Sequence, residues 1–200
     1  MTIVRTFFYW VCWVLFRCGY FCWLPMTVSG RENLPKGPFI FACNHLSYLD
    51  PTTVALAAIK RTSFVARDTL FRNPIFKAII STGGAIPITR NSADIGAIKT
   101  IIKSLKQYPI VIFPEGTRHK QKRIKDIEAG IGLIAVKSKV PVVPVYLEGT
   151  DVAFGSGAKC IKPARLTIRF GKPVTYTKAD GNFKEIANKI YTTIYELKQD

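Results

Sequence analysis

Acidic residues are scarce in this chain of 200 residues, in which 13 Asp and Glu stand against 29 Lys and Arg. The formal net charge of +16 at pH 7 excludes a preference for cationic partners and predicts anionic ones. An anionic membrane leaflet, a nucleic acid and a phosphorylated small molecule all meet that description, and charge alone does not rank them.

Tryptophan is absent after residue 23. All three Trp residues, together with six Phe or Tyr, lie between Phe7 and Trp23. A protein that binds nucleic acid would interleave its aromatic residues with its basic ones. The separation of the two kinds of residue therefore favours a membrane surface and predicts no nucleic-acid partner.

Cysteine pairs with the spacing of zinc ligands are also lacking. The chain has five cysteines, an odd number, and three of them fall in the apolar N-terminal part. They are Cys12, Cys18, Cys22, Cys43 and Cys160. This pattern predicts reduced thiols in a protein that faces the cytosol, and it gives no reason to expect a metal.

No uninterrupted apolar run is long enough for a comfortable bilayer crossing. Only residues 6–16 separate Arg5 from Arg17, whereas a crossing takes about 20 apolar residues. A secretory signal is disfavoured too, because no small-residue cleavage site occurs before Pro25. We expect residues 1–25 to associate with a membrane as an interfacial, re-entrant or single spanning anchor, and the alternative is an unusually aromatic core helix.

Residues 26–200 have the pattern of one α/β domain, in which short apolar runs alternate with helical stretches. The predicted strands cover residues 39–43, 62–66, 85–88, 110–113, 142–146 and 166–170. The predicted helices cover residues 50–59, 73–81, 98–105, 128–137 and 183–194. This alternation predicts a central sheet, mostly parallel or mixed, with helices on both faces.

The stretch NHLSYLD, residues 44–50, is the first candidate site. His45 leaves the end of a buried strand, and Asp50 precedes Pro51 at a helix start, where we expect it to be the N-cap. A tight turn would bring the carboxylate to one imidazole nitrogen and leave the other facing the carboxyl edge of the sheet. Such an arrangement suits a general base, and the alternative is a purely structural histidine and cap.

A nucleophile elbow of the form G-x-S-x-G is absent. Cys43 lies on the buried strand, where burial would raise the pKa of its thiol. Ser47 lies inside the turn, where its hydroxyl can bond the backbone. Direct attack by a substrate hydroxyl that His45 activates is therefore the simplest scheme.

The stretch FPEGTR, residues 113–118, follows another predicted strand. Gly116 permits close approach to the backbone, and Arg118 offers a planar guanidinium group suited to phosphate oxygens. Glu115 is placed to hold that guanidinium. An ordinary strand-exit turn with a solvated ion pair is the alternative.

Two more stretches complete the set. GAIPITR, residues 84–90, brings Arg90 to the same edge of the sheet, and Arg67 ends a neighbouring strand. VPVVPV, residues 140–145, has two prolines, which suit the entry of an apolar strand rather than its middle.

In their order and spacing, the stretches NHLSYLD, GAIPITR, FPEGTR and VPVVPV resemble the four motif blocks of the glycerolipid acyltransferase family. The similarity is greatest to the PlsC-like 1-acylglycerol-3-phosphate acyltransferases. It covers residues 44–145, about half of the chain, and identifies residues 26–200 as an acyltransferase domain.

The resemblance implies acyl transfer from acyl-CoA or acyl carrier protein to the sn-2 hydroxyl of lysophosphatidate, without a covalent acyl-enzyme or a cofactor. It implies a membrane-associated enzyme on the cytoplasmic face, with His45 as the base and Asp50 as its orienting partner. It also implies an acceptor-binding group that comprises Arg67, Arg90, Glu115, Gly116, Thr117 and Arg118. Relatives often have lysine at the position of Arg67.

Two alternatives remain open at this point. Within the family, the acceptor could be another lysophospholipid, an acylated amino-acid lipid or glycerol 3-phosphate. Outside it, the chain could be a non-catalytic binder of anionic membranes or nucleic acid, which is what charge alone would support.

Overall fold

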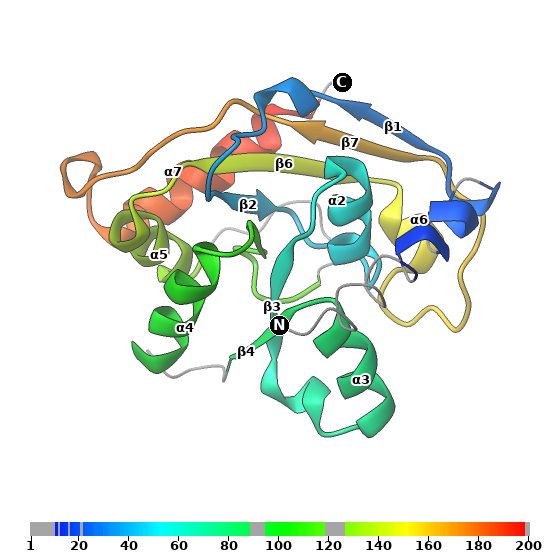
Figure 1. Cartoon of the computed structure of the whole chain (residues 1–200). Helices are drawn as coiled ribbons and strands as arrows, with labels where there is room; N and C mark the ends of the chain where they lie inside the picture. The colour runs from blue at the N-terminus through cyan, green and yellow to red at the C-terminus, as the bar shows by residue number, and fades with distance from the viewer. Residues whose placement is uncertain are drawn as a thin grey trace.

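A seven-stranded mixed sheet forms the centre of the computed structural model (Figure 1), which describes residues 11–88, 95–118 and 127–198 apart from residues 12, 16 and 21. The strands are β1 (Met26–Ser29), β2 (Ile40–Cys43), β3 (Ser63–Arg67), β4 (Ala85–Ile88), β5 (Ile110–Ile112), β6 (Val142–Glu148) and β7 (Leu166–Phe170). Their order is β1-β7-β6-β2-β5-β3-β4, and every neighbouring pair is parallel except β6 and β7. The predicted α/β class with a mixed sheet is confirmed.

Helices connect the strands and cover the sheet. The α-helices are α2 (Asp50–Ala58), α3 (Pro74–Thr82), α4 (Ile95–Leu105), α5 (Gly130–Ser138), α6 (Thr150–Phe154) and α7 (Phe183–Glu196). Three 3-10 turns lie at η1 (Arg31–Asn33), η2 (Asp68–Phe71) and η3 (Lys178–Asp180). Long crossovers of this kind are what parallel strands require, because a tight hairpin cannot join them.

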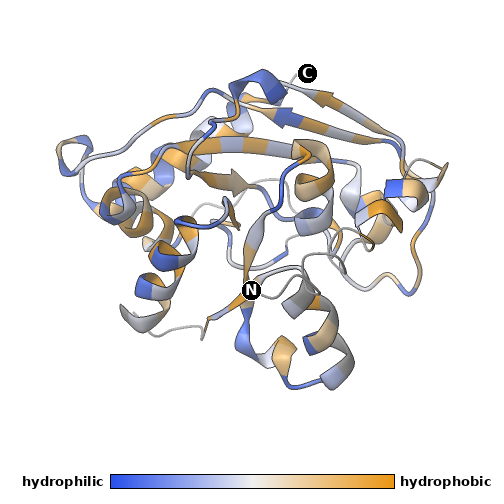
Figure 2. Cartoon of the chain, in the orientation of Figure 1, coloured by the Kyte–Doolittle hydropathy of each residue, from blue (hydrophilic) through white to orange (hydrophobic). Residues whose placement is uncertain are grey.

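Strand β2 shows how the sheet divides the hydrophobic core into two layers. Ile40 and Ala42 point to the cluster beneath α4, α5 and α7, while Phe41 and Cys43 point to the cluster beneath α2 and α6. All four are fully buried, as expected where successive side chains alternate between two covered faces. Figure 2 shows the same layering, with mainly hydrophobic strands between helices that carry both hydrophobic and hydrophilic stripes.

The described residues between 11 and 23 are helical and pack on the core at one end. Tyr20 is buried, and its hydroxyl lies 3.1 Å from the Oγ1 of Thr53 on α2. Val14, Leu15 and Trp23 are exposed. In the part of the chain that the structure describes, no helix has both the length and the apolar character needed to cross a bilayer. The expectation for residues 1–25 falls partly outside the described residues and stays a prediction.

The two prolines of VPVVPV occupy different places. Pro141 precedes β6, as predicted, but Pro144 lies inside this central strand, opposite Ala42, so the prediction is wrong for Pro144. The Pro144 carbonyl accepts a hydrogen bond of 2.8 Å from the amide of Gly171, which follows the end of β7. The N and C=O of one strand residue point to the same side, so the missing N–H of Pro144 faces Gly171, beyond the β7 ladder.

Candidate active site

His45 and Asp50 meet in the turn between β2 and α2. The Nδ1 of His45 lies 2.8 Å from the Oδ2 of Asp50, whose side chain is fully buried. The same Oδ2 accepts hydrogen bonds from the amides of Leu46 (2.7 Å) and Ser47 (2.8 Å). Asp50 is the first residue of α2 rather than its N-cap, a position that Leu49 takes, so that prediction is wrong. The carboxylate folds the turn before the helix instead of capping the amides within it.

This turn leaves one side of the imidazole open. Because the carboxylate of Asp50 accepts the Nδ1–H of His45, the Nε2 atom carries the free lone pair. The ring stacks on Phe113 of the neighbouring β5 exit, with centroids 4.0 Å apart and planes at 20°. The His45 side chain is 17% exposed. The imidazole is therefore fixed in orientation and accessible at its edge, as a general base must be.

The two nearby nucleophilic side chains are engaged or buried. Burial, together with the charge of Asp50, raises the pKa of the Cys43 thiol well above its ordinary value. The Ser47 hydroxyl donates to the carbonyl of Phe154 at 2.6 Å and accepts from the amide of Leu49 at 3.1 Å. Neither is placed as an activated nucleophile, which agrees with a mechanism of direct attack.

Glu115 leaves β5 and turns toward His45. Its Oε2 accepts the backbone amide of His45 at 3.2 Å, and its Oε1 accepts the hydroxyls of Tyr191 (3.2 Å) and Tyr195 (3.0 Å) from α7. The residue is only 7% exposed. Burial raises the pKa of Glu115 to about 7, against the lowering effect of these three hydrogen bonds. Among the described residues its carboxylate pairs with no cation, so the predicted hold on Arg118 is wrong.

Arg118 lies over an aromatic ring of the His45 turn. Its guanidinium carbon is 3.3 Å from the ring centroid of Tyr48, and its NH1 nitrogen is buried with no hydrogen-bond partner in the described part of the chain. Tyr48 itself is 49% exposed and contacts Phe154 on α6, with ring centroids 5.5 Å apart. Gly116, at φ 64°, makes the left-handed turn that separates Glu115 from Arg118.

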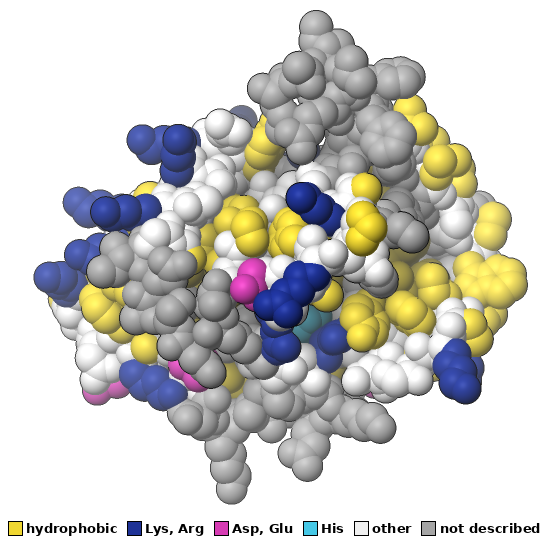
Figure 3. Space-filling view, turned by 90° about the horizontal axis from the view of Figure 1, so that it is seen from below, with side chains coloured by type: hydrophobic (Ala, Val, Ile, Leu, Met, Phe, Trp, Pro, Cys, Tyr) yellow, Lys and Arg dark blue, Asp and Glu magenta, His cyan; other side chains and the backbone are white. Residues whose placement is uncertain are grey.

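The structure brings most of the predicted site to one edge of the sheet. β2, β5 and β3 are consecutive in the sheet order and parallel, so their exits, which carry His45, Arg118 and Arg67, share that edge. Arg67 is exposed at the end of β3, and Thr117 is half-buried. Arg90 lies outside the described residues. In Figure 3, lysine and arginine side chains gather around the histidine, with hydrophobic side chains to one side.

The sequence of the motif-bearing half also matches a defined family. Residues 25–148, more than half of the chain, match the model of the family described as Acyltransferase. The chain belongs to the acyltransferase family.

Other members of the acyltransferase family show how far the similarity extends. A 1-acyl-sn-glycerol-3-phosphate acyltransferase of Cocos nucifera is 29% identical over 180 residues, which is 88% of this chain and 57% of that protein. One of Bacillus subtilis is 31% identical over 152 residues, 74% of this chain and 73% of that protein. The crystal structure of the 1-acyl-sn-glycerophosphate acyltransferase PlsC from Thermotoga maritima matches with a TM-score of 0.70 at 26% identity, covering 88% of this chain and 73% of that one.

The chain is shorter than several of these relatives. It spans 57%, 48%, 49% and 61% of the first four curated proteins that it matches. The acyltransferase family model nonetheless includes both the His45 turn and the Glu115 turn.

The sequence alone does not indicate three aromatic residues of the site. Tyr191 and Tyr195 are four residues apart on α7 and so share one face of the helix. Nothing in the sequence connects that face to Glu115, which precedes Tyr191 by 76 residues and Tyr195 by 80. Tyr48 stood within a recognised stretch, but its contact with Arg118 depends on how two separate turns lie side by side.

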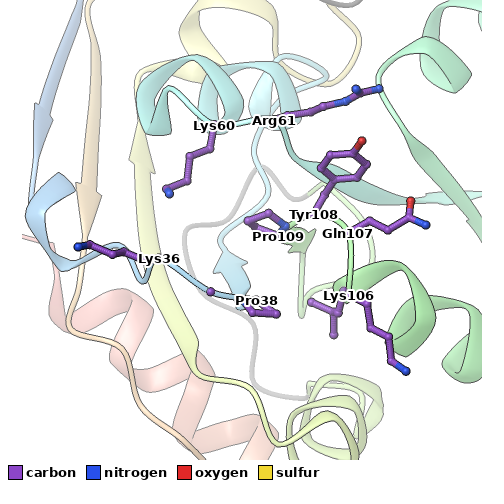
Figure 4. Close-up of a pocket in the computed structure, with 10 residues that line it drawn as sticks. Lys36, Pro38, Lys60, Arg61, Lys106, Gln107, Tyr108 and Pro109 are labelled. Atoms are coloured by element: carbon purple, nitrogen blue, oxygen red, sulfur yellow. The ribbon is translucent and has the colours of Figure 1, made fainter. Parts of the chain in front are cut away.

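A separate hollow of about 350 Å³ opens at the opposite edge of the acyltransferase domain (Figure 4). Its lining includes Lys36, Lys60, Arg61 and Lys106, and the Arg61 guanidinium lies 4.7 Å from the ring centroid of Tyr108. Helix α2 ends just before Lys60 and Arg61, and helix α4 ends just before Lys106, whereas Lys36 follows no α-helix. Cations complement the carbonyl end of a helix, so the helix ends account for much of the basic lining.

Proposed function

We propose that this chain transfers an acyl group from acyl-CoA or acyl carrier protein to the sn-2 hydroxyl of lysophosphatidate, giving phosphatidate. The single observation that carries the chemistry is the 2.8 Å contact between His45 Nδ1 and the buried Oδ2 of Asp50, which leaves Nε2 open. The acceptor is inferred from the relatives that are named 1-acyl-sn-glycerol-3-phosphate acyltransferases.

The proposed reaction begins at the accessible, unprotonated Nε2 of His45. Nε2 of His45 takes the proton of the acceptor hydroxyl as that oxygen attacks the thioester carbonyl. The tetrahedral intermediate then collapses, the carbon–sulfur bond breaks, and the imidazolium returns the proton to the leaving thiolate. Asp50 stabilises the imidazolium through Nδ1–H, as a carboxylate does in related triads. No covalent acyl-enzyme is needed.

In this proposal, the phosphate of the acceptor binds to the cationic residues at the same edge of the sheet as His45. Arg118 is the strongest candidate, because its guanidinium is already held over Tyr48 while one of its nitrogens is buried without a partner among the described residues. A guanidinium group binds two phosphate oxygens at once. Arg67, Arg90, Gly116 and Thr117 would complete the phosphate site.

The membrane supplies the acceptor in this proposal. Exposed apolar side chains of the N-terminal segment, among them Leu15 and Trp23, and a net charge of +16 suit the cytoplasmic face of an anionic bilayer. The chain would act there as a monotopic protein or through one N-terminal anchor.

An acceptor panel tests the substrate. The purified full chain is given one acyl-CoA and, in parallel, lysophosphatidate, glycerol 3-phosphate and a lysophospholipid without a phosphomonoester. We expect lysophosphatidate to be the best acceptor. If it is the poorest, the assignment within the family is wrong.

His45→Ala tests the chemistry. Loss of the general base should lower kcat by at least ~100-fold. Lys172→Ala, an exposed cation at the other end of the sheet, is the control and should keep full activity. Turnover retained in His45→Ala would reject the proposed role of His45 as the general base.

A further inference from the structure

Both oxygens of the Glu115 carboxylate are occupied by donors from the protein. Oε2 takes the His45 amide, and Oε1 takes the hydroxyls of Tyr191 and Tyr195. One carboxylate therefore joins the exits of β2 and β5 to helix α7. A group so engaged, and 7% exposed, is poorly placed to bind an acceptor.

His45 is consequently held at two points. Asp50 holds the ring through Nδ1, and Glu115 holds the backbone amide of the same residue. Any displacement of Glu115 shifts the backbone of His45, and with it the position of the imidazole, even when the hydrogen bond to Asp50 stays intact. Small displacements of a catalytic group cost rate, because proton transfer needs a defined geometry.

We infer that Tyr191 and Tyr195 are positioning residues of the active site, which act on the base His45 through the carboxylate of Glu115. The inference rests on the proposed acyl transfer for its kinetic readout. It assigns Glu115 a supporting role in place of direct acceptor binding. It also makes the C-terminal helix α7, which lies outside the matched family region, part of the catalytic apparatus.

The chemistry around Glu115 explains why hydroxyl groups are needed. Since no cation pairs with this carboxylate among the described residues, the two hydroxyls and one amide replace water as its donors. The titratable groups that face it are Tyr191 and Tyr195 from α7 and the His45 turn with Asp50, and Tyr146 of β6 packs edge-on against Tyr195. An ionised carboxylate accepts three donors, whereas the protonated form must itself donate.

The sign of the pH effect follows from these contacts. Burial raises the pKa of Glu115 to about 7, and the tyrosine hydroxyls lower it from what burial alone would give. Removing the hydroxyls must therefore raise this pKa further. As the pH falls, the ionised carboxylate that holds the His45 amide is then lost at a higher pH than in the wild type. The acidic limb of the kcat–pH profile should therefore move to higher pH.

The test is the Tyr191→Phe/Tyr195→Phe double variant. We expect kcat near neutral pH to fall by about 10-fold, the order of one to two hydrogen bonds, with the KM values of both substrates nearly unchanged. The acidic limb should move to higher pH. The matched control is Tyr176→Phe, which removes another buried hydroxyl bonded to α7, at Thr193 rather than Glu115. It should leave the limb in place.

A second readout does not depend on activity. A carboxyl whose pKa is raised on folding stabilises the protein below its unfolded value, near 4.5, and this contribution is lost as the pH rises through about 7. The unfolding free energy of the wild type should therefore fall across that window. In the double variant, this fall in unfolding free energy should extend to higher pH. In Glu115→Gln, the contribution of this carboxyl to the fall should vanish.

Three outcomes overturn the inference. They are an unmoved acidic limb in the double variant, an equal shift in Tyr176→Phe, or a loss confined to the acceptor KM, which would indicate that Glu115 binds the acceptor directly. A wild-type chain that lacks acyl transfer but shows the expected pH dependence of unfolding would reject the proposed function and keep the Glu115 network.

Discussion

At the scale of single residues, Asp50 shows how one oxygen atom can both shape a turn and orient a neighbouring imidazole. Its Oδ2 accepts the imidazole N–H of His45 and the amides of Leu46 and Ser47, while its Oδ1 has no hydrogen-bond partner in the described part of the chain. The oxygen that shapes the turn thus also orients the imidazole of His45. A neutral amide in this position would present only one acceptor oxygen and an unwanted donor.

Tyr48 is predicted to set the affinity for the acceptor through Arg118. The guanidinium carbon lies 3.3 Å from the Tyr48 ring centroid, and a cation–π contact contributes about 0.5–2 kcal/mol. Tyr48→Leu should therefore raise the acceptor KM by about 2- to 30-fold at saturating donor, with a smaller change in donor KM. The measurement is initial rate against lysophosphatidate concentration.

Tyr48→Phe is the matched control, because it keeps the ring and removes only the hydroxyl. It should retain the acceptor KM of the wild type. A Phe variant as weak as the Leu variant would mean that the hydroxyl, not the ring, supports Arg118.

The residues of the site differ in how far the sequence alone reveals them. His45 and Asp50 are five positions apart, so a single turn unites them and a local pattern is sufficient. The sequence indicates Glu115 as part of the site but not its two tyrosine partners, because these come from α7. Long-range side-chain contacts depend on the packing angle of a helix on a sheet, which a local pattern does not contain.

At the scale of elements, the buried strands were predictable and the marginal elements were not. β2 is fully buried on both faces and reads as a continuous apolar run. β1, at the edge of the sheet, alternates between exposed and half-buried residues over only Met26–Ser29 and was missed. The five-residue helix α6 was missed as well, because it lies between glycines and is too short for a helical period.

Close contact between α5 and α7 is predicted to depend on Gly132. A Cβ atom there would collide with the carbonyl oxygen of Phe183 and lie 3.1 Å from the amide of Ala187. Gly132→Ala should therefore push the two helices apart and lower the unfolding free energy by about 1–3 kcal/mol. Denaturant unfolding followed by circular dichroism measures the change.

Gly130→Ala, two residues earlier at the start of α5, provides the comparison. A Cβ atom there meets nothing within 4 Å. Its stability should be unchanged or higher by up to about 1 kcal/mol, because alanine is the better helix former. Equal destabilisation by both substitutions would show that close packing against α7 is not the cause.

At the scale of the whole molecule, sheet order accounts for the position of the site. The neighbours β2 and β5 are parallel, so two sequence-distant turns leave the sheet at one edge and place His45 beside Phe113. The hydrophobic side chains seen beside the basic ones in Figure 3 lie on this same face. Under the proposed function, a lipid acceptor would keep its chain on apolar surface while its headgroup reaches the cations.

The whole surface is predicted to bind anionic membranes by two separable contributions. With a net charge of +16, the full chain should sediment with vesicles of phosphatidylcholine and phosphatidylglycerol far more than with phosphatidylcholine alone at about 0.1 M salt. Near 1 M salt, where charges are screened beyond about 3 Å, the difference between the two kinds of vesicle should largely vanish.

Apolar contacts with the membrane do not weaken with salt. Some vesicle binding should therefore persist near 1 M salt, and it should be reduced in Trp23→Ser, which removes an exposed indole. Equal binding to both vesicles at low salt would contradict the electrostatic contribution, and unchanged high-salt binding of Trp23→Ser would contradict the apolar one.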